Sequence, residues 1–180
     1  MIKGTDAEEH LFRSLESFKN LAVNLKSHRH AGMAMIVAAA LDRLLEDALL
    51  TKMVKLSEER RKKLFGDYGT LRSFDAKIKV AFAFAVIDRE TSQRLTIIRK
   101  IRNKFAHTEG FLDFNSPEIK SILSTQRGSI SATSSMEFFF STASLIESSI
   151  VKATGLADRN LMVGIMAARR EGLERAVKSR

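Results

Sequence analysis

Apolar side chains recur at helical spacing through residues 31–54, and this pattern limits the possible folds more than any other feature. Those that share one broad face are Ala34, Val37, Ala38, Leu41, Leu44, Leu45, Ala48 and Leu49. A recurrence every three to four residues predicts an amphipathic helix with its apolar face buried. We find no strand-type alternation elsewhere, so the sequence predicts an all-α fold, a single-domain multi-helix bundle.

Helix-starting residues divide the chain into segments. N-cap residues stand at Thr5, Asp88, Ser116, Ser134 and Asp158, and two of them, Thr5 and Ser134, have a glutamate three residues later, as in a capping box. The predicted helices span about 5–27, 31–54, 57–65, 73–86, 88–108, 116–124, 134–153 and 158–176.

The chain of 180 residues suits one domain, 1–180. The glycine-flanked GDYGT (66–70) predicts a tight turn, and the Ser/Thr-rich STQRGSISATSS (124–135) predicts a loop. The segment 158–180 predicts a basic amphipathic C-terminal helix. It is either a solvated or docking helix or, as the alternative, a nucleic-acid tail.

Composition excludes several function classes. The chain has no cysteine, which excludes disulfides, Cys-ligated zinc and thiol catalysis. The polar N-terminus lacks the apolar core of a secretion signal, and the longest apolar run, 33–41, is far too short for a membrane span. We therefore expect a cytoplasmic protein with no membrane, metal or cofactor, and we interpret His28 and His30 as a polar helix junction. The formal charge of +9 favours nucleic acid or acidic partners.

The stretch RKIRNKFAH (99–107) ends a strongly helical segment and holds four cationic residues and a histidine. At about 100° per residue, Arg102 falls within the apolar face formed by Leu95, Ile98, Ile101 and Phe105, whereas Arg99, Lys100 and Lys104 point away from it. An arginine cannot lose its charge, so Arg102 requires an acidic partner or a cleft that reaches solvent.

Asp42 and Glu46 are the candidate acidic partners of Arg102. They lie one turn apart at the edge of the apolar face of 31–54, where they either form a solvated edge or reach a buried cation on a neighbouring helix. His107 follows Arg102 by five positions, so a regular helix points it about 140° away. Joint action needs the helix to end there, or a second subunit; alternatively, His107 interacts with the last helical carbonyls.

Several phrases in order resemble the mannitol operon repressor (MtlR-like) family. They are LDRLLEDALL (41–50), the glycine turn, SFDAKIKVAFAFAVI (73–87) and IIRKIRNKFAH (97–107), and the resemblance covers about residues 31–110. It implies a regulator of a sugar-alcohol operon. No helix-turn-helix with an exposed recognition helix is evident, so repression would work through a protein or nucleic-acid partner.

The segment from Arg102 to His107 is also similar to the motif of the wider HEPN superfamily. That resemblance implies a helical bundle that often dimerises with the motif near the interface. In active HEPN ribonucleases, which need no metal, the equivalent of Arg102 stabilises the phosphate charge, that of His107 acts on the 2′-hydroxyl or leaving oxygen, and that of Asn103 orients them.

Three hypotheses follow. The first, which we favour, is a non-enzymatic, homodimeric transcriptional regulator. The second is a metal-independent, toxin-like endoribonuclease that uses Arg102 and His107. The third is a bundle in which these two residues only brace the helices. No phosphate-binding glycine loop or nucleophile elbow supports another enzyme class.

Overall fold

The computed structural model describes residues 4–108, 110–125, 132 and 134–156, with side chains described from residue 28 onward. Its helices are α1 (Gly4–Lys52), α2 (Glu58–Phe65), α3 (Phe74–Ala83), α4 (Arg89–His107), α5 (Pro117–Ser124) and α6 (Ser135–Thr154). Every regular element in these ranges is a helix, which confirms the all-α, multi-helix bundle. The predicted C-terminal helix and most of the predicted loop at 124–135 lie outside the described residues.

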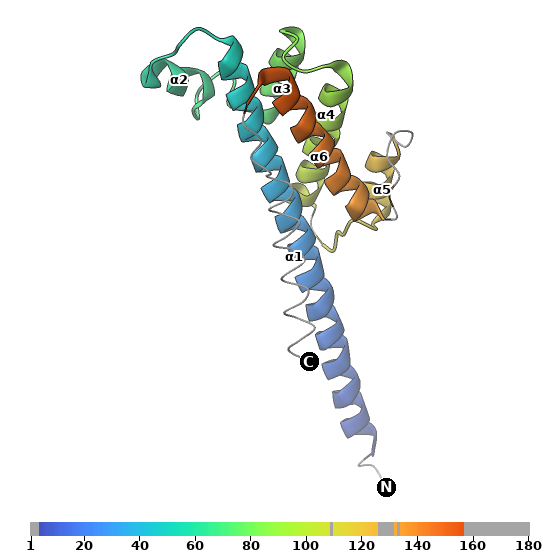
Figure 1. Ribbon diagram of the computed structural model, residues 1–180. Helices are drawn as coiled ribbons and strands as arrows, with labels where there is room; N and C mark the ends of the chain where they lie inside the picture. The colour runs from blue at the N-terminus through green and yellow to red at the C-terminus, as the bar shows by residue number, and fades with distance from the viewer. Residues whose placement is uncertain (1–3, 109, 126–131, 133, 157–180) are drawn as a thin grey trace.

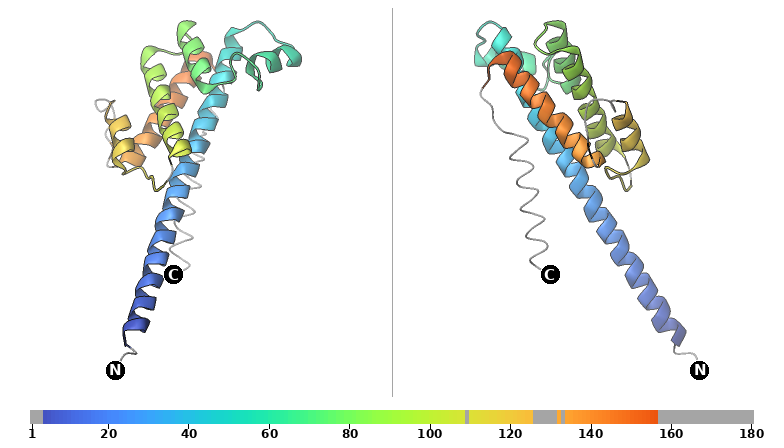
Figure 2. Two further views of the ribbon diagram at one scale, coloured as in Figure 1. Left: turned by 180° about the vertical axis from the view of Figure 1, so that it is seen from behind. Right: turned by 45° about the vertical axis from the view of Figure 1, so that its right-hand side comes forward.

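Helix α1 is the longest element of the fold. Its 49 residues correspond to a length of about 74 Å at 1.5 Å per residue. Its N-terminal part extends beyond the other labelled helices, and its C-terminal part packs against them (Figures 1 and 2). Despite this length, no helix among the described residues is apolar enough over a sufficient stretch to cross a membrane.

The predicted break between 27 and 31 is wrong, because α1 continues through it. Gly32 lies on an open side of the helix, where an added Cβ would meet no atom within 4 Å. His30 lies within the continuous helix and is buried instead of forming a polar helix junction, and its Nδ1 accepts a hydrogen bond from the Phe114 N–H at 3.3 Å. A glycine costs a helix about 1 kcal/mol relative to alanine, which the buried residues on either side offset.

Helices α1, α4 and α6 all pack against one another and form the centre of the bundle. Helix α3 packs on α1 and α4, and α5 packs on α4 and α6. The largest side chains that are fully buried are Leu41, Leu44, Leu45, Leu49, Leu95, Ile98, Ile101, Phe114, Ile119, Phe139, Phe140 and Ile146. The apolar faces predicted for 31–54 and 88–108 therefore meet in one core.

Polar side chains start four of the helices. Ser57, Ser73, Asp88 and Ser134 each accept a hydrogen bond from the backbone N–H three residues later, as N-cap residues do. Ser116 precedes α5 as predicted but makes no such bond; its Oγ accepts from the Asp113 N–H at 2.9 Å instead. The predicted starts at 88, 116 and 134 are therefore confirmed.

The GDYGT segment forms the predicted turn between α2 and α3. The Gly69 N–H donates to the Gly66 carbonyl at 2.8 Å, and the Leu71 N–H donates to the Leu64 carbonyl at the same distance. A Cβ on Gly69 would lie 2.1 Å from the Leu64 carbonyl oxygen. Only glycine fits this approach of the turn to the end of α2.

Candidate functional site

A buried lysine joins α3 to α1. Lys77 lies on α3, and its side chain is 4% exposed. Its Nζ donates to Asp42 Oδ2 and to Glu46 Oε2, at 3.1 Å each, and lies 5.8 Å from the centroid of the Phe65 ring. A buried ammonium is tolerated only when it is paired and hydrogen-bonded, and these two carboxylates meet that need.

Glu46 extends the cluster to α2. Its Oε1 accepts hydrogen bonds from Arg61 Nη2 at 2.9 Å and from Arg61 Nε at 3.3 Å. A guanidinium that donates two hydrogen bonds to one carboxylate is held in direction as well as in distance. One carboxylate of α1 thus binds cations from both α2 and α3, although α2 itself buries no residue.

The two carboxyl groups of this cluster respond oppositely to their surroundings. Burial raises the pKa of Asp42, and the nearby Lys77 and Arg102 charges offset this only in part. Burial also acts on Glu46, but there the hydrogen bonds from Arg61 and Lys77 outweigh it, so that the pKa of Glu46 is lowered. Glu46 is therefore the more firmly ionised of the two.

The structure corrects the predicted partner of Asp42 and Glu46. They do reach a buried cation on a neighbouring helix, but that cation is Lys77, and Arg102 forms no ion pair among the described residues. The sequence contained the signal, because Lys77 shares a helical face with Phe74, Ile78 and Ala81, all four of them buried. The same helical-wheel argument would have marked Lys77 as a second buried cation, although it could not have assigned Lys77 to Asp42.

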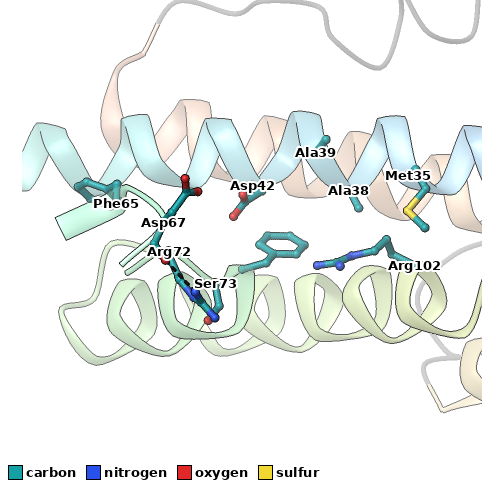
Figure 3. Close-up of a pocket in the computed structure, with 10 residues that line it drawn as sticks. Met35, Ala38, Ala39, Asp42, Phe65, Asp67, Arg72, Ser73 and Arg102 are labelled. Atoms are coloured by element: carbon teal, nitrogen blue, oxygen red, sulfur yellow. Dashed lines mark hydrogen bonds between the residues drawn. The ribbon is translucent and has the colours of Figure 1, made fainter. Parts of the chain in front are cut away.

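Arg102 instead lines a cleft. The cleft lies between α1, the α2–α3 turn and α4, and its volume is about 630 Å³ (Figure 3). Arg102 projects into it from α4, and Asp42 projects from α1 on the opposite side. Arg102 is half-buried, and its charge acts to lower the pKa of Asp42. Of the two predicted alternatives for Arg102, the described residues show the cleft.

His107 is the last residue of α4 and is exposed. The helix remains regular to that point, and the Thr108 N–H donates to the Lys104 carbonyl beyond it. His107 therefore points about 140° away from Arg102 and does not line the cleft. Asn103 is half-buried and is also absent from the lining. Within one chain, the three motif residues do not form a common site.

The remaining cations of the stretch 99–107 differ from one another. Lys100 and Lys104 are exposed, as predicted. Arg99, which the wheel also directs away from the apolar face, is half-buried rather than solvated, and its Nη2 lies 3.1 Å from Asp75 Oδ1 on α3. The basic appearance of this stretch in the sequence thus separates into an interhelical ion pair, two solvated lysines and the cleft residue Arg102.

Among the described residues, no group of three or more histidine or acidic side chains is placed to hold a metal ion. A scan of the chain against protein-family models finds no match. Searches of curated proteins and of solved structures also find none.

Proposed function

We propose that this protein is a non-enzymatic regulator of the MtlR-like kind, which lowers gene expression by binding a protein partner through the turn between α3 and α4. The observation that carries the proposal is a pair of exposed aromatic side chains at this turn. Phe84 is 75% exposed and Phe82 is 42% exposed. Exposed apolar side chains that group into a surface patch often mark a site of protein–protein contact.

The backbone holds this turn in a defined shape. Val86 and Ile87 are buried, and their N–H groups both donate to the Ala81 carbonyl, at 2.8 and 3.3 Å. Between them and the helix, Ala85 adopts a φ of 52°, a left-handed conformation that costs a non-glycine residue about 1 kcal/mol. The turn is held by α3 on one side and by Val86 and Ile87 on the other, so the backbone at Phe84 has little conformational freedom. Less conformational entropy is then lost when a partner binds.

The turn also carries a cation. The Arg89 guanidinium carbon lies 5.9 Å from the centroid of the Phe82 ring, and both residues are exposed. Phenylalanine and arginine are each enriched at protein interfaces relative to the rest of the surface. This favours a protein partner over nucleic acid at the turn, although the formal charge of +9 leaves nucleic acid as the competing partner class.

The experiment complements a strain that lacks the gene with the wild type, with Phe84→Ser or with Phe111→Ser. The measured quantity is the level of the transcripts that rise when the gene is lost. Phe111 is the matched control, because it is 51% exposed but follows the opposite end of α4. We expect Phe84→Ser to lose regulation and Phe111→Ser to retain it. A Phe84→Ser variant that is folded and regulates like the wild type overturns the proposal.

An endoribonuclease is the second candidate function, and one observation favours it. Arg102 has no ion pair among the described residues and opens into a cleft, and His107 is exposed on the same helix. Because the two point apart in the regular helix, a joint site would require either a distortion of α4 before His107 or the His107 of a second copy. The second route agrees with the homodimer that we propose from the HEPN resemblance.

A further inference from the structure

The cleft next to Arg102 has the dimensions of a small-molecule site. Its volume of about 630 Å³ lies within the range of roughly 300–1,000 Å³ typical of ligand pockets. Met35, Ala38 and Phe74 give it apolar walls, and Ala38 and Phe74 are each only 3% exposed. A ligand with an apolar body would therefore meet a partly apolar wall that is already formed.

The charges around the cleft leave one cation over. Asp42 and Glu46 are balanced by Lys77 and Arg61 in the buried cluster. Arg72 donates to the Asp67 backbone carbonyl oxygen at 2.7 Å. Asp67 and Arg72 both line the cleft, so together they add no net charge to it. The Arg102 guanidinium is the remaining charge, and it projects into the cleft (Figure 3), whose lining also includes Phe74.

We infer that this cleft binds a small organic carboxylate, with its anionic group on Arg102 and its apolar body against Met35, Ala38 and Phe74. Guanidinium and carboxylate groups match in geometry and form paired charge-assisted hydrogen bonds. The half-buried position of Arg102 reduces the screening that weakens ion pairs on open surface. This inference does not depend on the proposed regulatory function or on the partner at the α3–α4 turn.

The cleft also predicts which ligands are rejected. An uncharged isostere would fill the apolar part but leave Arg102 without an anion. An organic cation would meet the Arg102 charge directly, and the Lys77 ammonium already binds Oδ2 of Asp42. The cleft should therefore prefer an organic anion to its amide and to its amine.

The experiment titrates the full-length protein, labelled with ¹³C at its methionine methyl groups, with benzoate, benzamide and benzylammonium. We expect benzoate to shift the Met35 signal with saturation, and benzamide and benzylammonium to bind at least tenfold more weakly. Arg102→Gln should weaken benzoate binding about tenfold or more, and Arg102→Lys should restore part of it. Lys100→Gln, on the exposed side of the same helix, should bind like the wild type.

A second variant gives a change of the opposite sign. Asp67→Asn removes a negative charge from the lining and leaves the backbone carbonyl that binds Arg72, so benzoate should bind several-fold more tightly. If benzoate leaves the Met35 signal unchanged, binds no better than benzamide, or binds equally to folded Arg102→Gln, the inference is wrong. Equal weakening by Lys100→Gln would also overturn it, because it would indicate diffuse attraction to a basic surface.

Discussion

Lys77 Nζ and Asp42 Oδ2 lie 3.1 Å apart, and the lysine side chain is almost completely removed from solvent. The pair connects α3 to α1, and Glu46, which binds the same Nζ, extends the connection to Arg61 on α2. Helix α2 buries no residue completely; this cluster and Phe65, which is partly buried against the core, connect α2 to the bundle. It also places Asp42 at the wall of the cleft.

The first prediction concerns the loss of this lysine. Lys77→Ala leaves the Asp42 carboxylate without its cation in a partly buried position, and breaking a buried pair in this way costs about 3–5 kcal/mol. We expect a loss of about 3 kcal/mol in the free energy of unfolding, measured by urea denaturation. The matched control is Lys79→Ala on the same helix, because Lys79 pairs with Asp75 while 75% exposed, and such pairs contribute about 0–1 kcal/mol. Equal effects of the two changes would contradict the prediction.

The second prediction concerns pH. Because the pKa of Glu46 is lowered in the folded state, its ionisation stabilises the fold above its unfolded value of 4.5, and this contribution is lost as the pH falls through the folded pKa. The pKa of Asp42 is raised mainly by burial. Its ionisation therefore costs stability as the pH rises from 3.8 through the folded pKa.

Unfolding by urea at a series of pH values tests whether Glu46 and Asp42 change the stability with pH in opposite directions. As the pH rises through the acid range, the stability advantage of the wild type over Glu46→Gln should grow, whereas its advantage over Asp42→Asn should shrink. Both variants also weaken the pairing of Lys77, which changes stability by an amount that does not depend on pH. The test therefore compares the slopes of the stability difference against pH, not its absolute size. Slopes of the same sign for the two variants would show that burial does not dominate at Asp42.

The sequence was sufficient for the fold class and for the core faces, because helical spacing depends on local order alone. It was insufficient at His30 and Gly32, where local polarity predicts a break but burial against Phe114, 84 positions away from His30, keeps α1 continuous. For Arg102, the wheel gave the correct direction and the wrong partner. The partner depends on which helix crosses α1 next to Asp42, and periodicity carries no information on that crossing.

The third prediction concerns the backbone strain at the α3–α4 turn. Ala85 has a φ of 52°, which glycine adopts without the steric cost of a Cβ. We expect Ala85→Gly to stabilise the protein by up to about 1 kcal/mol, although glycine normally destabilises. Ala39→Gly, at an exposed position in the interior of α1, should instead cost about 1 kcal/mol. A thermal or urea unfolding comparison in which both changes destabilise would mean that Ala85 is unstrained.

The fourth prediction distinguishes the regulator from the ribonuclease. In one chain Arg102 lines the cleft, while exposed His107 at the end of the same helix points away from it, so general acid–base chemistry has no common reaction centre. We expect total RNA to remain intact with the wild-type protein at high concentration, as judged by gel electrophoresis. Cleavage that disappears in an Arg102→Ala/His107→Ala double variant would contradict this and favour the ribonuclease.

The same assay tests a site shared between two copies. Arg102→Ala and His107→Ala are purified separately, then mixed under conditions that allow subunits to exchange. If the wild type cleaves RNA and each variant alone does not, cleavage by the mixture would mean that one copy supplies the arginine and the other the histidine. A mixture as inactive as its components would place both groups in a single chain, which would require α4 to distort before His107.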